Sequence, residues 1–473
     1  MKNKILEKII MAAICISIVF TPINVNALEE YKQIHKDAIV VDSHIDTILF
    51  AIDQDTYLPI RKLYDYSKSC VNVKKMRQGG VDVAFWAAYT EGTQLKGKNQ
   101  IDYNYANNEI LASINGLYYV VDNNKSLELA KSTSEIKNLV NKNKSVAVSS
   151  VEGAYSLNSS NYKKLLRQYY DLGVRCLSLT HNKSSAICDG AYETYPGNMG
   201  TSSLGGLSKS GKNAIIEMNK LGMIVDVSHL SYDAVADVLN TSTAPVIASH
   251  TGLRKFVNLK RNLTDYQAKK IAGKGGLIQV SFDRYMMGDS IKDVVDTIDY
   301  LVDLVGVDHV GIGSDFDGNL RMKGLEDVSK VPNLTKELVN RGYSKSDIEK
   351  ILGGNLLRVM KIVEDKATYK KANTCGLKIK SQTKMSSKVD RTKRTFKANV
   401  IETSKSKINP DSISVIIDGK SQDFTYSSKY KTITVKLKSN LKSKYHVITF
   451  YAKDKNSKEV RETVIFYTKD YSR

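Results

Sequence analysis

The chain has 473 residues, too many for one average domain, and its 42% apolar and 25% charged residues are typical of folded globular proteins. This composition excludes a disordered chain, and an apolar run at residues 9–20 is too short for a comfortable membrane span. The net charge of +20 lies mostly in residues 371–473, which hold 24 Lys and Arg against 9 Asp and Glu. A region this basic indicates an anionic partner, or only a solvated basic face.

Residues 1–27 have the layout of a secretory signal peptide. Lys2, Lys4 and Lys8 precede the apolar run, and "VNA" at residues 25–27 offers a cleavage point. We therefore expect an exported protein, either extracellular or associated with the cell surface. The expected partner of the basic region is then an anionic cell-wall or surface polymer rather than a nucleic acid. A homodimer stays open as a further partner.

Residues 28–370 are predicted to form the first domain. Eight apolar runs alternate there with amphipathic segments, and continuous apolar runs are typical of strands buried on both faces. Eight strands with helical crossovers favour a (β/α)8 TIM-like barrel over an open doubly wound sheet. The expected strands are residues 38–42, 81–88, 145–151, 174–180, 223–229, 244–250, 276–282 and 309–315. Two helices, at 333–342 and 344–365, are expected to follow them.

Residues 371–473 are predicted to form a basic, Lys-rich linker and a small all-β, sandwich-like domain. Their apolar residues alternate with polar ones, which is typical of strands with one buried face. The expected strands are residues 412–418, 431–438, 445–453 and 459–468.

Polar side chains gather where the expected barrel strands end. His44 and Asp46, in the stretch "IVVDSHIDTILF", are two residues apart and so share one face of a strand. In a barrel of this kind the chemistry lies at the C-terminal rim. The other strand ends carry Glu152, His181, His229, His250 and Asp315, so four of the seven histidines of the chain fall at this rim.

This set of side chains predicts a metal centre. Buried polar groups are costly without partners, and a divalent cation would satisfy several of them at once. Neutral imidazoles with carboxylates and no thiolate favour Zn²⁺, with Mn²⁺ or Co²⁺ as substitutes. One catalytic zinc takes about three protein ligands, so the larger set here predicts two ions about 3.5–4 Å apart.

Several of these motifs occur together in one known family. In this order, "VVDSHID", "SSVEGAYSL", "GVRCLSLTHN", "GMIVDVSHLS", "PVIASHTG", "KRNLTD" and "HVGIGSDFDG" resemble the membrane (renal) dipeptidase family of zinc metallopeptidases. The likeness covers residues 30–365. It implies a binuclear zinc enzyme that hydrolyses the peptide bond of L-L and also L-D dipeptides with a hydroxide held between the two ions.

The resemblance also implies a role for each site residue. Asp315 would shuttle a proton to the leaving amine, and His181 would help bind the substrate and its tetrahedral intermediate. Arg261, in "KRN", would bind the terminal carboxylate of the dipeptide. The implied metal ligands are His44 and Asp46 for one zinc, His229 and His250 for the other, and Glu152 as the bridge between them.

Two alternatives stay open at this point. The chain could be another metal-dependent amide or lactone hydrolase on the same barrel, or a catalytically decayed surface-binding protein. The segment "QVSFDRYMMG" differs from the family's usual sequence, and a tyrosine expected to help hold the substrate carboxylate does not align, although Tyr285 is near. Asp317 is expected to be a turn or supporting residue, because Asp315 already fills the strand-end position.

Overall fold

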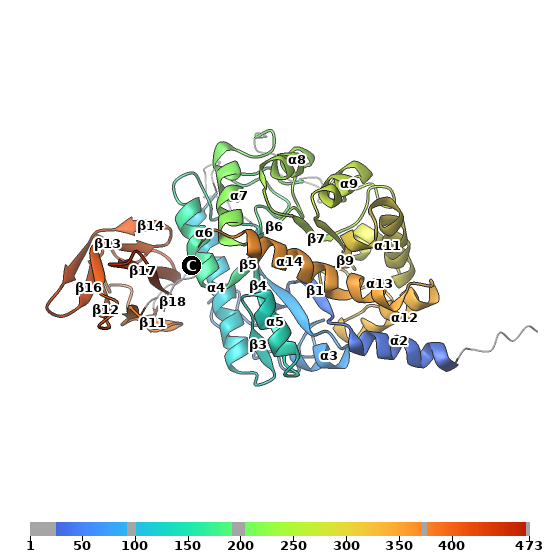
Figure 1. Ribbon diagram of the computed structural model, residues 1–473, viewed down its shortest axis with the longest axis horizontal. Coiled ribbons are helices and arrows are strands. Elements are labelled where there is room, and N and C mark those ends of the chain that lie inside the picture. The colour runs from blue at the N-terminus through green and yellow to red at the C-terminus, as the bar shows by residue number, and fades with distance from the viewer. Residues whose placement is uncertain (1–24, 92–100, 192–203, 370–375, 470–473) are drawn as a thin grey trace, which may run out of the picture.

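The computed structural model describes residues 25–91, 101–191, 204–369 and 376–469. Most of the expected signal peptide, residues 1–24, lies outside the described residues, as do residues 370–375 of the expected linker. The described chain begins in helix α2 (Val25–Asp37), at the edge of the first domain (Figure 1). Within the described parts, no helix is both long enough and apolar enough to cross a membrane.

The first domain is a parallel eight-stranded barrel, which confirms the predicted fold class. In pairing order its strands are β1 (Val41–Ile45), β2 (Val83–Tyr89), β4 (Ser145–Glu152), β5 (Val174–Ser178), β6 (Ile224–Asp226), β7 (Ile247–Thr251), β8 (Leu277–Val280) and β9 (Val310–Ile312). A parallel bridge between Ile45 and Phe316 brings the end of β1 beside the segment after β9. There the backbone N–H of Asp46 donates to the Phe316 carbonyl at 2.9 Å, so the ring closes at the rim.

All eight predicted strands are present, and most of them are shorter than the apolar runs from which they were predicted. Every residue of β4 is buried, as expected for a strand with the barrel interior on one face and helices on the other. The sequence did not indicate β3 (Leu127–Leu129), which pairs with β4 outside the ring, because three residues are too short a run to show a pattern.

Helices surround the barrel (Figure 1). Several begin at a Ser or Thr cap; the Ser231 side chain, for example, accepts the Ala234 N–H. They are α3 (Val73–Gln78), α4 (Tyr103–Asp122), α5 (Thr133–Val140), α6 (Tyr162–Asp171), α7 (Lys209–Leu221), α8 (Tyr232–Thr241), α9 (Asp265–Gly273), α10 (Arg284–Met287), α11 (Ile291–Val305), α12 (Pro332–Asn340), α13 (Lys345–Glu349) and α14 (Asn355–Lys366).

The helix predicted at residues 344–365 is divided into α13 and α14 by a wider turn at Lys350–Gly354. Gly353 lies in that turn against the backbone before β1, where a Cβ would stand 2.2 Å from the Ile39 carbonyl oxygen. This contact between segments distant in sequence interrupts a helix that the local periodicity favours throughout.

The second domain consists of two β-sheets packed face to face, as the alternating pattern predicts. Phe396 and Phe466 meet between the sheets, with ring centroids 4.9 Å apart. One sheet contains β10 (Lys378–Ser381), β12 (Thr395–Ile401), β16 (Thr432–Lys436) and β15 (Phe424–Ser427). The other contains β11 (Ser387–Val389), β18 (Glu459–Thr468), β17 (Tyr445–Asp454), β13 (Ile408–Ile417) and β14 (Lys420–Gln422).

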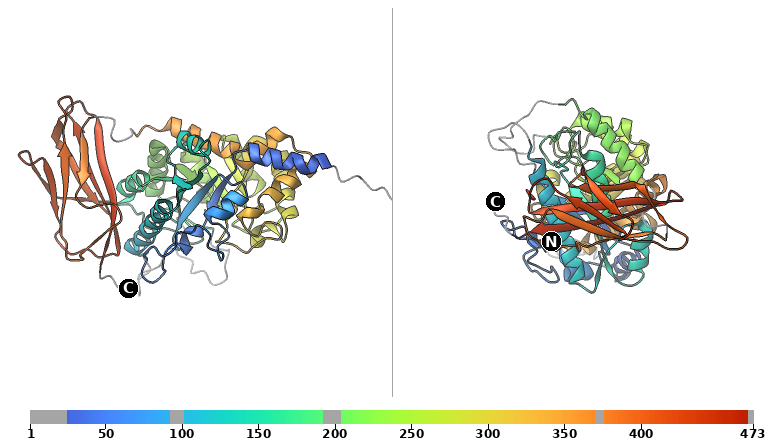
Figure 2. Two further views of the ribbon diagram at one scale, coloured as in Figure 1. Left: turned by 90° about the horizontal axis from the view of Figure 1, so that it is seen from below. Right: turned by 90° about the vertical axis from the view of Figure 1, so that its left-hand side faces the viewer.

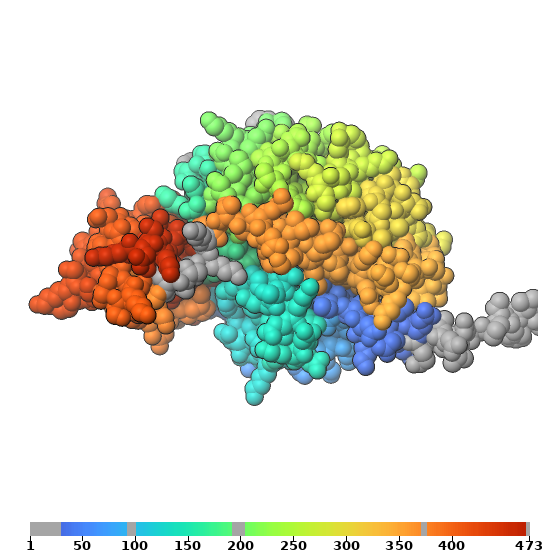
Figure 3. Space-filling model, in the orientation of Figure 1, coloured from blue at the N-terminus to red at the C-terminus, as the bar shows by residue number. Residues whose placement is uncertain are grey.

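The second domain lies against α4 and α6 on one side of the barrel (Figures 2 and 3). Gln168 of α6 is buried at this contact, where its side chain accepts the Gly419 N–H at 2.7 Å and donates to Thr449 Oγ1 at 3.2 Å. The Tyr445 hydroxyl donates to the Tyr57 carbonyl at 2.8 Å. Buried polar groups from both domains thus satisfy one another across the contact.

Candidate metal centre and active site

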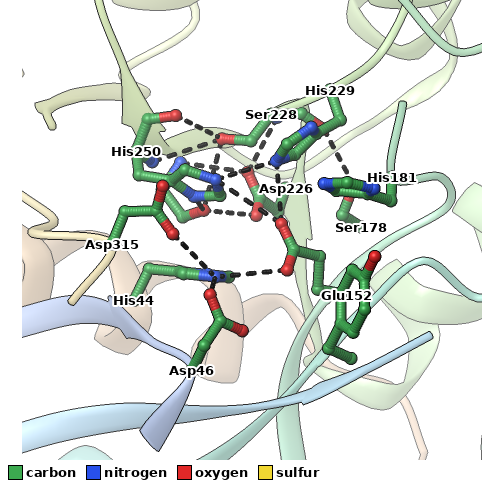
Figure 4. Close-up of polar contacts among 12 residues, drawn as sticks. His44, Asp46, Glu152, Ser178, His181, Asp226, Ser228, His229, His250 and Asp315 are labelled. Carbon is green, nitrogen blue, oxygen red and sulfur yellow. Dashed lines mark hydrogen bonds and ion pairs between the residues drawn. The ribbon is translucent and has the colours of Figure 1, made fainter. Parts of the chain in front are cut away.

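The structure brings all the predicted rim residues into one cluster. They come from separate strands or from the first residues after them, and Figure 4 shows the side chains pointing toward one another. His44 and His250 lie on β1 and β7, and Glu152 ends β4. The remaining members follow β1, β5, β6 and β9 by one to three residues and are Asp46, His181, His229 and Asp315.

Glu152 lies at the centre of the cluster. Its Oε2 atom is 3.5 Å from His44 Nε2, on the side of Asp46. Its Oε1 atom is 2.8 Å from His229 Nε2 and 3.5 Å from His250 Nε2. Each carboxylate oxygen therefore faces a different group of ligand atoms, which is the arrangement that a bridging carboxylate requires.

The donor set fits divalent cations. His44 Nε2 and Asp46 Oδ1 are buried and form no hydrogen bond in the described structure, although buried polar atoms normally have partners. Ligand atoms of His44, Glu152 and His250 lie within 4.8 Å of one another, as do those of His44, Asp46 and Asp315. Imidazole nitrogens and carboxylate oxygens without a thiolate match zinc and related ions.

The electrostatics of the cluster are those of carboxylates crowded in a buried site. Burial and the neighbouring Asp46 carboxylate raise the pKa of Asp315 well above its ordinary value. Burial alone would also raise the pKa of Glu152, but the imidazoles of His44 and His229 outweigh it and hold that pKa well below its ordinary value. Cations among these groups would relieve the repulsion between the carboxylates.

Two of the site residues have a left-handed backbone, with φ of 67° at His229 and 60° at Asp315. Residues other than glycine rarely adopt this conformation, and it costs on the order of 1–3 kcal/mol at each position. Gly318 is tightly constrained as well, because a Cβ there would stand 2.1 Å from Asp46 Oδ2. The turns after β6 and β9 therefore aim their side chains inward at the expense of backbone strain.

Glu91, two residues after β2, is a member of the site that the sequence reasoning missed. Its Oε2 atom lies 2.6 Å from His181 Nδ1, and its Oε1 atom lies 3.2 Å from Lys183 Nζ. Burial alone would raise the pKa of Glu91, but the hydrogen bond and charge of His181, together with Tyr89 and Lys183, outweigh it and lower the pKa to about 2. The available signal was a carboxylate directly after a strand end, in "AAYTEG".

Asp226, the last residue of β6, is a second supporting residue that was missed. It accepts a hydrogen bond from Ser249 Oγ at 2.5 Å, and Ser249 Oγ lies 2.9 Å from His250 Nδ1. The chain of contacts directs the other ring nitrogen of His250 toward Glu152 (Figure 4). Nothing in the local sequence separates Asp226 from an ordinary strand residue.

Asp317 has the supporting position expected of it. Its side chain accepts hydrogen bonds from the N–H groups of Cys70 and Val71 and from the hydroxyl of Thr47, so its oxygens hold two loops together.

Arg261 is buried at the site, where its guanidinium donates a hydrogen bond to the His250 carbonyl at 2.7 Å.

A pocket of about 290 Å³ opens over the cluster. Asp46, Glu152, His181, Arg261 and Asp315 all line it. Asp283 and Tyr285, from the segment that departs from the family's pattern, also contribute to its wall. Tyr285 therefore lies at the pocket, with 44% of its surface exposed.

The family model of the membrane dipeptidases, peptidase family M19, matches residues 28–374. The chain belongs to this family. It is thus a metallo-dipeptidase, and the interpretation as a decayed binding protein is not needed.

Curated relatives agree with this assignment. Dipeptidase tcpJ of Claviceps purpurea is 31% identical over 361 residues, which cover 74% of this chain and 81% of the relative. Dipeptidase 3 of Mus musculus is 31% identical over 346 residues, covering 71% of this chain and 66% of the relative. The crystal structure of the probable dipeptidase PvdM from Pseudomonas aeruginosa superposes with a TM-score of 0.63 at 25% identity, covering 72% of this chain and 99% of that one.

Proposed function

We propose that this dipeptidase uses two zinc ions, replaceable by Mn²⁺ or Co²⁺, to hydrolyse L-L and L-D dipeptides. The position of Glu152 carries the proposal, because its two oxygens face separate ligand groups. One group is His44 with Asp46, and the other is His229 with His250. A pair of cations would supply Lewis acidity and lower the pKa of water toward neutrality.

Asp315 is proposed to transfer the proton to the leaving amine. It is 9% exposed, lines the pocket, and has Oδ1 3.9 Å from His44 Nε2. A carboxyl group there can reach a peptide nitrogen bound over the cluster and remain in contact with the pocket. His181, held by Glu91, is proposed to help bind the substrate.

Arg261 is proposed to bind the terminal carboxylate of the dipeptide. Its guanidinium lines the pocket and is anchored from behind by the His250 carbonyl. A planar and permanently charged group suits a carboxylate. A longer peptide would place an amide against this buried cation and leave the charge unpaired, so the arrangement favours dipeptides.

A metal count combined with a peptide panel tests these proposals. We expect elemental analysis of the purified protein to find two zinc ions per chain. L-Ala-L-Ala and L-Ala-D-Ala should release free alanine, whereas tri-L-alanine should not be cleaved. One metal ion per chain in a fully active protein, or equal turnover of the tripeptide, would contradict the proposal.

We also propose that the protein is exported and that its second domain binds an anionic surface polymer. The basic charge of residues 371–473 supports this, as does a polar hollow whose lysines outnumber its two carboxylates, Asp418 and Asp423. The lysines are Lys420, Lys436, Lys438 and Lys442. Such binding should weaken as salt is added. Retention of the protein on a polyanionic resin at increasing salt tests the binding, and retention that does not depend on salt would contradict it. Cell fractionation tests the export, and a cytoplasmic location would contradict it.

A further inference from the structure

Asn182 links two histidines of the site. It directly follows His181 and is 1% exposed. Its Oδ1 atom lies 3.1 Å from His229 Nδ1, and its Nδ2 atom lies 3.2 Å from His181 Nε2. The two rings lie side by side in Figure 4, with centroids 4.4 Å apart. One amide therefore touches both a metal-ligand candidate and a substrate-binding candidate.

The contact with His229 bears on which ring nitrogen carries the proton. His229 Nε2 faces Glu152, so this nitrogen must offer its lone pair if it is to hold a cation. The proton of the neutral ring must then be on Nδ1, and the carbonyl oxygen of Asn182 can accept it. Outer partners of this kind fix the orientation of metal-ligating histidines.

Arg261 favours the opposite tautomer. Its Nε atom is also 3.1 Å from His229 Nδ1, and a guanidinium N–H can only donate a hydrogen bond. Accepting that bond would leave the ring proton on Nε2, where it would prevent ligation. Asn182 and Arg261 thus compete for one nitrogen, and Asn182 is the neighbour that permits metal binding.

The other end of the amide fits the same scheme. Asn182 Nδ2 can donate to His181 Nε2, and His181 Nδ1 can donate to Glu91 Oε2 at 2.6 Å. Every group in the series from Glu91 to His229 then has a complementary donor or acceptor. An amide is suited to the central position because it offers one donor side and one acceptor side.

On the basis of the proposed metal site, we propose that Asn182 is a positioning residue. Its carbonyl oxygen holds His229 in the tautomer that ligates a cation, and its amino group holds the ring of His181 against the pocket wall. Ser249 and Asp226 have the corresponding position behind His250, on a different strand pair.

Two substitutions separate the two ends of the amide. Asn182→Leu removes both, and we expect the affinity for Zn²⁺, measured by competition with a chelator, to fall by about 10- to 100-fold. Asn182→Asp keeps an oxygen for His229 but removes the donor to His181. Its zinc affinity should stay at or above that of the wild type, whereas its KM should rise by about 3- to 10-fold.

Asn219→Leu is the matched control, because Asn219 is also buried but accepts hydrogen bonds from the Ser242–Thr243 turn, away from the pocket. It should leave zinc affinity unchanged even if it lowers the melting temperature. Wild-type zinc affinity in Asn182→Leu, or an equal loss in Asn182→Asp, would overturn the inference. A wild-type protein that bound no zinc would overturn the proposed function instead.

Discussion

Asp315 and Asp317 are two residues apart and line the same pocket, yet their surroundings differ. The Asp317 oxygens are occupied by backbone N–H groups and a hydroxyl, so this residue shapes the loops. The Asp315 carboxylate faces His44 and Asp46 and has a pKa well above its ordinary value. These surroundings support the proposed role of Asp315 in proton transfer.

Replacing Asp315 by Asn tests that role. The amide keeps the size of the side chain but cannot exchange a proton, so kcat should fall by about 10²- to 10⁴-fold. The metal content should stay at the wild-type value, because the proposed metal ligands are untouched. Asp289→Asn, at a residue with an 82% exposed side chain, is the control and should keep full activity. Loss of a metal ion from Asp315→Asn would show that Asp315 is itself a ligand.

At the scale of the elements, the turns after the strands determine the site. The strands supply rigid positions, and a left-handed backbone at His229 and at Asp315 turns these two side chains toward the cluster. At the opposite ends of the strands, polar side chains form hydrogen bonds with the backbone instead of gathering at a site. There, Asp82 accepts the Val40 N–H at 2.9 Å and so joins the segments that lead into β1 and β2.

The ionisation of Asp82 should make stability depend on pH. Burial raises the pKa of Asp82 to about 6. The folded state therefore binds the proton more tightly than the unfolded state, and stability falls as pH rises from about 4 through 6. Asp82→Asn removes this dependence and can still accept the Val40 N–H. It should stabilise the protein by roughly 1–2 kcal/mol at pH 8, after allowance for partial exposure.

The urea midpoints of the wild type and of Asp82→Asn, measured at pH 4.5 and at pH 8, test this prediction. The difference between the two midpoints should be small at pH 4.5 and larger at pH 8. A difference of the same size at both values would show that the charge of Asp82 is not its cause.

At the scale of the whole molecule, we expect the contact between the two domains to couple their unfolding. The Nε atom of Arg461, in β18, lies 3.1 Å from Oδ1 of Asp171, in α6. The guanidinium of Arg461 also stacks on the Tyr369 ring, with its central carbon 3.9 Å from the ring centroid. Both charged side chains are largely buried, and removal of one buried partner leaves the other uncompensated. The second domain therefore supports the barrel as well as carrying the basic charge.

Arg461→Ala should destabilise the barrel, although Arg461 lies in the second domain. The loss should be roughly 3 kcal/mol, the cost of leaving Asp171 buried without its partner. Trp86 is the one tryptophan of the chain and is buried in β2, so its fluorescence reports barrel unfolding. The urea midpoint seen by Trp86 should fall in Arg461→Ala but not in Arg284→Ala, which removes an exposed ion pair. An unchanged midpoint in Arg461→Ala would mean that the domains unfold independently.

The local pattern of the sequence was sufficient for the eight barrel strands, the all-β character of the second domain and the chemical types at the rim. Apolar periodicity reflects which faces become buried, and residues at the ends of parallel strands converge on the same rim whatever their separation along the chain. His44, Glu152, His229 and His250 could therefore be grouped before their distances were known.

The supporting contacts could not be obtained in this way. Glu91 beside His181, Asn182 between two imidazoles, and Gln168 beneath the second domain depend on distances of a few ångströms between segments far apart in the chain. An Asn or Glu that serves such a contact has the same local sequence as one in solvent. Only the folded arrangement, which sets each donor opposite its acceptor, distinguishes the two.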